Sequence, residues 1–567
     1  MEWIPGDRWL IRGERYTLRM AERRPALLME GKDGVLLCEL FLVSSIHAAA
    51  GRDLSSSISP IAFEQSGKGV TLRFSADSTV WERKEYTLFA GEDGLTYDVC
   101  VTGRGALEEA ELLSGYYSGS NDRCGTARHY SGFPADSLMN PEPDGSERRF
   151  VSPLERTMID LMGVPIPGRD HWFFTPPPFC FVLRKGEICY TLGVTAKPGH
   201  HTFTEYEYLG GTGGGLRLRY EGYQKVDGRY DLPRLHLTLG TDEYGLLAGF
   251  SALERRTDTK KAQAAWWQKP IFCGWGAQCA MGGVHCQSAP LLSRQEFYET
   301  IGRELEEKNL HPGILVIDDK WQKQYGLNDV DVEKWPDMKG FISAMHGKGR
   351  KVLLWLKAWD PQGVAPDLCI RDFQGNKLAV DPTHPGYVRL FGHAAEYMLS
   401  PQGLDADGFK IDFTARIPSG PGCRLHDHSI WGLELMRAYL AMVYDQAKRT
   451  KEDALIMCHC PHPYLQDKCD MIRLNDVNMG HPVNPQMVHR ARVAAAAMPD
   501  CLIDTDNWPM PDKAAWLSYV KLQPGLGVPS LYYLWQMDNG NEAITGDDLD
   551  AVRESWQSYE RGLHEKP

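Results

Sequence analysis

The feature that most constrains the fold is a regular alternation of apolar strand-like runs with helical patterns, which begins near Trp266. Eight such units fit within the 297 residues from 271 to 567. A (β/α)8 TIM barrel typically needs about 250 residues. The helical patterns include Arg294–Lys308, Trp431–Lys448, Asn484–Met498 and Leu549–Leu563. The strand candidates are Ile271–Gly276, Gly313–Ile317, Lys351–Leu356, Asp407–Asp412, Ala454–Cys458, Met471–Asn475, Cys501–Thr505 and Val528–Leu534.

A doubly wound sheet also fits this alternation, but it concentrates its chemistry at one switch point. Here polar residues follow most of the strand candidates, which favours the barrel, where all carboxyl ends form one ring. We therefore predict a catalytic (β/α)8 barrel over residues 261–567.

The first 260 residues lack helical periodicity and contain short β-rich runs separated by turns such as Gly31–Gly34 and Gly91–Gly94. This pattern predicts an N-terminal β-sandwich domain over residues 1–260. The segment 114–178, rich in Gly, Pro, Ser and Tyr, is predicted to be a long loop. The predicted strands are Arg15–Met20, Ala26–Glu30, Val35–Leu42, Gly69–Ser75, Glu85–Ala90, Leu95–Thr102, Glu187–Thr195, Leu216–Glu221 and Arg234–Leu239.

Composition excludes several classes of partner. The formal net charge of −13 argues against binding to nucleic acid, whose phosphates would be repelled. No run approaches eighteen apolar residues, and no signal peptide is visible, so we expect a cytoplasmic protein without membrane contact, whose fourteen cysteines stay reduced. The oligomeric state stays open, a homo-oligomer included.

Polar residues lie at the predicted strand ends, and four of these ends carry carboxylates around the same mouth of the barrel. These carboxylates would repel one another unless cations or a polyhydroxy ligand intervened, so the pattern indicates a sugar pocket. The residues are Trp275, Asp318, Asp319, Trp355, Lys357, Lys410, Asp412, Cys458, His459, Arg473, Asp476, Asp504 and Asp506.

Two of these aspartates suit the two roles of glycoside cleavage. Asp412 is the predicted nucleophile, because Lys410 lies on the same strand face and keeps a neighbouring carboxylate ionised. Asp476 is the predicted general acid/base, with a pKa raised in a partly dry pocket, and Arg473 would hold the sugar nearby. The alternatives are a structural ion pair at Asp412 and a chain turn at Asp476.

Asp318 and Asp319 are predicted to accept hydrogen bonds from sugar hydroxyls, and Trp321 or Trp355 to stack on the sugar face. A divalent cation is the competing ligand for the paired carboxylates. The clusters Cys458–His462 and His426–His428 suggest zinc, but the ligand spacing of a closed zinc site is missing. We therefore predict pocket-lining thiols, a substrate contact for His459, and no metal or cofactor.

Several segments resemble the retaining α-galactosidase clan, and within it glycoside hydrolase family 36 with its raffinose-synthase and seed-imbibition-like branch. Lys320 stands where that family usually has Gly in its Asp-Asp-Gly-Trp segment. The other matches are the Lys-x-Asp nucleophile motif, the acid/base segment, the Asp-x-Asp motif and a sandwich segment. In this chain the five segments read Ile317–Trp321, Phe409–Asp412, Met471–Asp476, Asp504–Asp506 and Thr175–Val182.

The resemblance implies an enzyme that cleaves terminal α-linked sugars, most favourably α-galactosides, by double displacement. Retention predicts carboxyl groups about 5–5.5 Å apart. The alternatives are transfer to a sugar acceptor, a carbohydrate-binding barrel without turnover, and metal-dependent hydrolysis through the Cys/His clusters.

Overall fold

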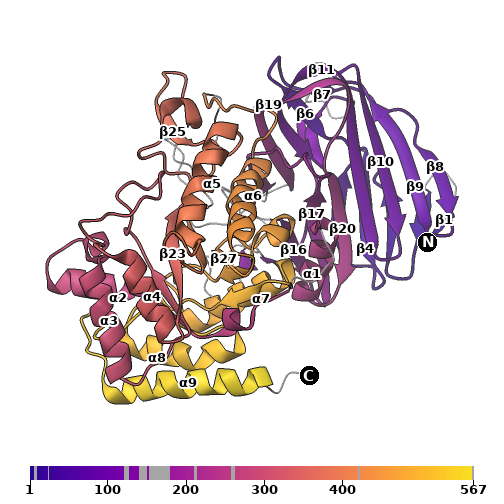
Figure 1. Ribbon diagram of the computed structural model, residues 1–567. Coiled ribbons are helices and arrows are strands. Elements are labelled where there is room, and N and C mark those ends of the chain that lie inside the picture. The colour runs from indigo at the N-terminus through magenta and orange to yellow at the C-terminus, as the bar shows by residue number, and fades with distance from the viewer. Residues whose placement is uncertain are drawn as a thin grey trace.

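The computed structural model describes residues 1–4, 9–22, 24–119, 127–139, 150–151, 179–209, 214–256, 262–414, 416–418, 420 and 422–564. Antiparallel β-sheets occupy the N-terminal part, and a ring of parallel strands with interleaved helices follows (Figure 1). The predicted combination of a β-sandwich and a TIM barrel is therefore confirmed. None of the described helices has both the length and the apolar character needed to cross a lipid bilayer.

The smaller N-terminal sheet is an antiparallel meander whose strands pair in chain order. Alternate residues of β3 and β4 are buried, as expected for strands that cover a core with one face. Its strands are β1 (Glu2–Ile4), β2 (Leu10–Arg12), β3 (Tyr16–Met20), β4 (Ala26–Gly31) and β5 (Leu36–Phe41).

The larger sheet has twelve strands, and its main path runs β15-β14-β16-β17-β20-β11-β10-β9-β8. Its strands are β6 (Ser45–Ala48), β8 (Ala62–Ser66), β9 (Gly69–Ala76), β10 (Arg83–Gly91), β11 (Gly94–Leu112), β14 (Ser137–Met139), β15 (Phe150–Val151), β16 (Cys180–Lys185), β17 (Ile188–Thr195), β18 (Glu205–Leu209), β19 (Gly215–Asp231) and β20 (Arg234–Gly240). A third sheet joins β7 (Leu54–Ser55), β12 (Ser114–Tyr117) and β13 (Ala127–Tyr130).

The eight barrel strands pair in parallel and in chain order, and β30 returns to pair with β21. A parallel bridge between Asp504 and Val528 links the seventh strand to the segment before the eighth, so the ring nearly closes. The strands are β21 (Ile271–Cys273), β22 (Ile314–Ile317), β23 (Lys351–Lys357), β26 (Gly408–Asp412), β27 (Leu455–Cys458), β28 (Met471–Arg473), β29 (Leu502–Asp504) and β30 (Ser530–Leu531). The pair β24 (Cys369–Arg371) and β25 (Lys377–Val380) lies outside the ring.

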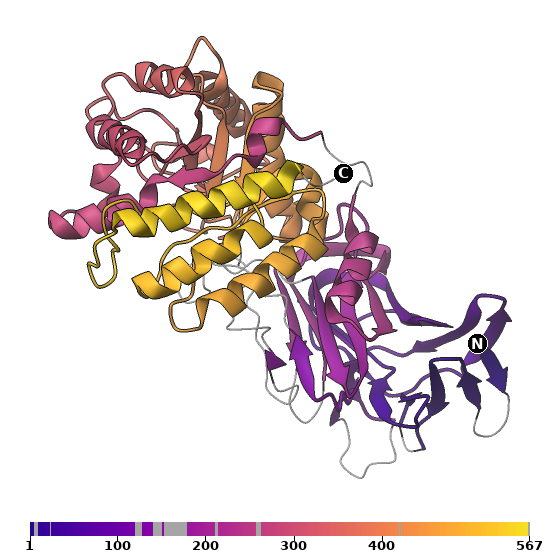
Figure 2. The same cartoon turned by 90° about the horizontal axis from the view of Figure 1, so that it is seen from below.

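Helices follow the barrel strands, and α9 lies along the outside beside α8 (Figure 2). Asp242, Asp337 and Asp512 cap α1, α4 and α8 by accepting the N–H of the residue three positions on. The helices are α1 (Glu243–Glu254), α2 (Gly274–Val284), α3 (Gln295–Glu307), α4 (Met338–Gly347), α5 (Pro385–Leu399), α6 (Leu433–Thr450), α7 (Val483–Ala497), α8 (Lys513–Leu522) and α9 (Gly546–His564).

Four predicted segments differ in detail from the structure. The first barrel strand ends at Cys273 because α2 begins at Gly274, so Trp275 lies in a helix and not at a strand end. The strands β11 and β19 run well beyond the predicted segments 95–102 and 216–221. The predicted loop 114–178 carries four short strands, β12 to β15. Residues 120–126, 140–149 and 152–178, and with them Thr175–Pro178, lie outside the described residues.

Candidate active site

The predicted site residues gather at one end of the barrel. Asp318 follows β22, Lys410 and Asp412 lie at the end of β26, and Arg473 ends β28. Because the strands are parallel, their carboxyl ends share one rim, and the hydrogen bonds described below connect these side chains directly.

The Arg473 guanidinium is the hub of this rim and is bonded to three carboxylates. Its Nη2 lies 3.0 Å from Asp412 Oδ1, and its Nη1 lies 2.8 Å from Asp476 Oδ1 and 2.7 Å from Asp506 Oδ2. Since one planar fork holds both carboxylates, the bonded oxygens of Asp412 and Asp476 lie within about 8 Å of each other. Arg473 is only 2% exposed, so it holds the three carboxylates from the buried side of the rim.

Asp412 is held by donors on both oxygens. Oδ1 accepts from Arg473 and from the N–H of Phe413 at 3.0 Å, whereas Oδ2 accepts from the Trp355 indole at 3.2 Å. Burial raises the pKa of Asp412, but Arg473, followed by His459 and Lys410, outweighs it and brings the pKa below its usual value. The carboxylate is therefore ionised at neutral pH, and 12% of its side chain reaches solvent.

Asp476 has the same functional group and the opposite shift. Burial raises the pKa of Asp476 to about 6, with Asp506 and Asp412 adding to the rise against Arg473. Its side chain is 20% exposed, more than that of Asp412. A carboxyl group with this pKa is partly protonated near neutral pH, which suits proton donation.

Lys410 does not pair directly with Asp412, although both side chains lie on the same strand. Its Nζ lies 2.7 Å from Asp318 Oδ2 and 3.4 Å from the sulfur of Cys273, and Cys273 Sγ lies 3.1 Å from the same carboxylate oxygen. The direct cation on Asp412 is instead Arg473, four strands from Asp318 around the ring. Sequence reasoning missed Cys273, because a thiol inside an apolar run is typical of a core residue.

Asp319 lies beside a tyrosine that was not predicted as a site residue. The Tyr325 hydroxyl donates to Asp319 Oδ1 at 2.6 Å. Burial raises the pKa of Asp319 to about 6, while the Tyr325 hydrogen bond opposes the rise. Tyr325 lies in a loop with no periodic signal, so only proximity in the fold reveals it.

The three predicted tryptophans play different structural roles. Trp321 is fully buried and donates to the backbone oxygen of Trp355 at 2.8 Å, so it supports the rim and presents no face to a ligand. Trp355 is also buried, and its indole N–H, not its ring face, meets Asp412. Trp275 is half-buried in α2 and meets the ring of Trp508 edge-on, with 5.7 Å between centroids.

His459 is placed against the nucleophile candidate as a neutral ring. Its Nε2 lies 3.8 Å from Asp412 Oδ1, accepts the N–H of Thr414 at 3.2 Å and lies 2.8 Å from the Thr414 hydroxyl. Burial lowers the pKa of His459 to about 4. Cys458 is buried below it in β27, and its sulfur accepts the N–H of Cys460 at 3.4 Å.

Asp504 and Asp506 complete the rim at β29. The N–H of Asp506 donates to Asp504 Oδ1 at 3.0 Å, and the Ser530 hydroxyl donates to the same oxygen. Burial and the neighbouring Asp506 raise the pKa of Asp504 to about 6. Asp506 is paired with Arg473, and its negative charge also acts on the neighbouring Asp476.

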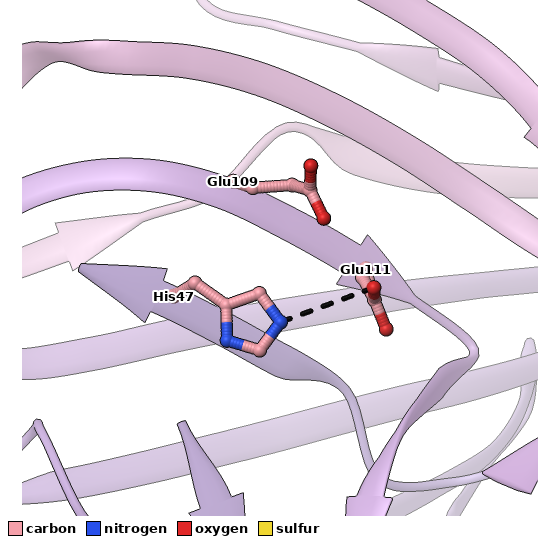
Figure 3. A group of neighbouring side chains, drawn as sticks. All are labelled: His47, Glu109 and Glu111. Atoms are coloured by element: carbon pink, nitrogen blue, oxygen red, sulfur yellow. Dashed lines mark ion pairs between the residues drawn. The ribbon is translucent and has the colours of Figure 1, made fainter. Parts of the chain in front are cut away.

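One possible metal-binding group lies in the sandwich and not in the predicted Cys/His clusters. In the described part of the chain, only His47, Glu109 and Glu111 bring three ligand atoms within 4.8 Å of one another (Figure 3). However, His47 Nδ1 accepts the N–H of Asp53, so a neutral ring carries its proton on Nε2, the atom that faces Glu111. Arg128 also binds Glu111 through two nitrogens. The group is therefore a charge network already supplied with a cation.

The amino-acid sequence matches no protein-family profile and no curated protein. The structure does match many solved chains. An α-galactosidase from Thermus thermophilus in complex with stachyose is 14% identical with a TM-score of 0.54, over 88% of this chain and 99% of that one.

Two further solved structures cover 99% of this chain at 11% identity. A GH31 sulfoquinovosidase from E. rectale with an aza-sugar inhibitor has a TM-score of 0.59, over 82% of its own length. A GH31 α-xylosidase from a soil metagenome, complexed with xylose, has a TM-score of 0.54, over 84% of its own length. At these identities the likeness concerns architecture: the chain shares the sandwich and barrel of α-glycosidases of these kinds.

Proposed function

We propose that this protein is a retaining glycoside hydrolase that cleaves terminal α-linked sugars, most favourably α-galactosides or close analogues. The observation that carries the proposal is the Arg473 fork, which holds Asp412 and Asp476 on one rim while their pKa values shift in opposite directions. The likeness in fold to an α-galactosidase and to an α-xylosidase supports the same reaction class.

In the first step, Asp412 attacks the anomeric carbon as the glycosidic C–O bond breaks, and the leaving oxygen takes the proton of Asp476. Oδ2 is the better placed attacking oxygen, because Oδ1 already accepts two hydrogen bonds and Oδ2 accepts one, at 3.2 Å. In the second step, Asp476 takes a proton from water, whose oxygen attacks the same carbon. The ester bond to Asp412 breaks as this attack occurs, which restores the carboxylate, and the sugar leaves with its configuration retained.

The remaining rim groups suit the recognition of sugar hydroxyls. Asp318 and Asp319 offer carboxylate oxygens beside Lys410, whose ammonium is fixed by Asp318. The neutral His459 lies on the other side of Asp412, within 3.8 Å of it. These groups surround the carbon that Asp412 would attack, and water exclusion by a bound sugar would strengthen each polar contact.

Chemical rescue tests both catalytic assignments separately. In Asp412→Gly, hydrolysis of an aryl α-galactoside should fall by at least about a thousandfold, and azide should restore turnover by attacking from the vacated face to give the β-glycosyl azide. In Asp476→Gly, azide should attack the glycosyl-enzyme and give the α-glycosyl azide. The product configuration, read by nuclear magnetic resonance, distinguishes the two roles.

The matched control is Asp227→Gly, which removes an exposed carboxylate of β19 in the sandwich. Its activity should equal that of the unmodified protein. Undiminished hydrolysis by Asp412→Gly, or a glycosyl azide of the same configuration from both catalytic variants, would reject the assignment.

A further inference from the structure

The rim of the site next to Asp319 carries an aromatic platform. The ring of Tyr325 lies 5.9 Å from that of Trp355, and the ring of Phe413 lies 6.2 Å from it, both edge-on. Trp355 bonds Asp412, and Tyr325 bonds Asp319. The platform is therefore continuous with the two carboxylates that would face a bound sugar.

Three cations lie over this platform. Lys320 Nζ is 3.9 Å and Lys357 Nζ is 4.4 Å from the centroid of the Tyr325 ring. Lys357 Nζ is also 5.5 Å from the Phe413 centroid, and the guanidinium carbon of Arg416 is 5.4 Å from it. We name Lys320, Lys357 and Arg416 the rim cations.

Among the rim cations, Lys357 and Lys320 are only partly neutralised by acidic neighbours. Lys357 pairs with Asp360 at 2.9 Å. Lys320 makes no ion pair within 4.0 Å with any carboxylate of the described residues, and its hydrogen-bond acceptor is the neutral amide oxygen of Gln362, at 3.0 Å. Two ammonium groups near one ring concentrate positive charge, and an anionic ligand beside them would offset it.

The rim cations lie close to the predicted point of reaction. Lys357 is the direct strand partner of Asp412 in the pairing of β23 with β26. On the floor of the site, by contrast, Lys410 and Arg473 are already engaged by Asp318 and by the three carboxylates around the Arg473 fork. Lys320 and Lys357 thus remain as the lysines available to an incoming ligand.

We propose that the rim cations bind an anionic substituent, a carboxylate or a sulfonate, carried by the terminal α-linked sugar on the side that faces Asp319. This inference rests on the proposed function, because it places the anion on the sugar that Asp412 attacks. On a hexose, the chemical form of such a group is a C6 carboxylate or C6 sulfonate in place of the hydroxymethyl group. A charged hydrogen bond to Lys320 would hold it, while the contacts with the rings of Tyr325 and Phe413 keep the rim cations in place.

The first test compares kcat/KM for aryl α-galacturonide, aryl α-galactoside and the C6-sulfonate analogue. The unmodified protein should prefer the anionic substrates, and this preference should decline as salt screens the rim. In Lys320→Gln, the ratio of kcat/KM for the anionic over the neutral substrate should fall by about tenfold or more, as expected for the loss of a charged hydrogen bond. Lys320→Arg should keep most of the ratio.

The matched control is Lys323→Gln, which removes an exposed lysine three residues further along the same loop and should leave the ratio unchanged. An equal loss on all substrates in Lys320→Gln would show a purely structural role for Lys320. An unaltered ratio in Lys320→Gln would likewise reject the anion site. If the protein prefers only substrates whose aryl leaving group carries the negative charge, the anion binds as part of the leaving group. That result would reject the assignment to the sugar.

A binding measurement separates this inference from the proposed function. Calorimetry on Asp412→Asn should show tighter binding of galacturonate than of galactose, and the difference should shrink in Asp412→Asn combined with Lys320→Gln. Intact discrimination in binding without turnover of any aryl α-glycoside would reject the proposed function alone. Turnover of neutral α-glycosides without such discrimination would reject the anion site alone.

Discussion

Asp412 and Asp476 share one guanidinium, yet their acidities diverge because their other neighbours differ. Asp412 receives the Trp355 indole and lies near His459 and Lys410, whereas Asp476 lies beside Asp506. The environment thus prepares an anion and a proton donor from the same chemical group.

The first prediction concerns the pH dependence of kcat/KM. Asp476 must be protonated to act as an acid, so the rate should fall as the pH rises through about 6. Asp412 must be ionised, and its lowered pKa places the acidic limb below pH 3.8. In Asp506→Asn the loss of negative charge beside Asp476 should move the alkaline limb lower, by about one pH unit. An alkaline limb at the same pH in Asp506→Asn as in the unmodified protein would show that a group other than Asp476 titrates there.

Most of the rim residues are predictable from the sequence, because a polar residue that follows an apolar run marks a strand end. Their partners are not. The spacing of Lys410 and Asp412 predicts a pair, but in the closed ring Lys410 reaches Asp318, and Arg473 reaches Asp412 from two strands away. Tyr325 and Cys273 carry no sequence signal, since their roles arise only from contacts across the barrel.

At the scale of elements, the barrel strands are the most predictable part of the chain. Strands such as β22 are buried at every position, so they form uninterrupted apolar runs. The extensions of β11 and β19 are not predictable in this way, because Gly103 and the charged residues after it interrupt the alternation. Their pairing with each other stabilises them instead.

The second prediction concerns the start of α6. Gly432 precedes this helix with φ 59° and ψ −132°, and an added Cβ would lie 2.1 Å from the backbone oxygen of Phe203 in the sandwich. Gly432→Ala should therefore lower the free energy of unfolding by about 1–3 kcal/mol through backbone strain alone, as measured by urea denaturation.

Gly249→Ala is the matched control, because Gly249 lies inside α1 with no atom within 4 Å of an added Cβ. It should stabilise the protein by about 0.5–1 kcal/mol. Equal effects at the two glycines would show that the contact with Phe203 is not constraining.

At the scale of the whole molecule, the sandwich and the barrel meet in a polar junction centred on a buried histidine. His201 Nε2 lies 2.8 Å from Glu254 of α1, and its Nδ1 lies 3.5 Å from Glu434 of α6. Its ring stacks on Tyr464 with 4.0 Å between centroids. Tyr464 belongs to the short helix η4 (Pro463–Lys468), which follows the segment carrying His459, so the junction supports one wall of the site.

The third prediction concerns this junction. Burial lowers the pKa of His201, but its bonds to Glu254 and Glu434 outweigh this and raise the pKa above 6.5. The stabilisation by protonated His201 is therefore complete below pH 6.5 and is lost as the pH rises through the folded-state value. His201→Gln should lower the free energy of unfolding by about 3 kcal/mol at pH 6, and the deficit should shrink toward pH 9.

His311→Gln serves as the control, since His311 is exposed and lies 3.6 Å from Glu306. Its effect should stay within about 0.5 kcal/mol at every pH. A deficit in His201→Gln that does not vary with pH would show that the ring contributes through packing alone.

The three-way bond of Arg473 also bears on timing. Once a sugar is esterified to Asp412, that aspartate is uncharged, and the guanidinium can lean more fully toward Asp476. The acidity of Asp476 then increases, so the donor of the opening half-reaction sheds its proton and becomes the acceptor that the closing half-reaction needs. A carbon-13 titration of Asp476, with and without a trapped fluoro-sugar, should show a lower pKa for Asp476 when the sugar is attached. Identical titration curves would disprove this change.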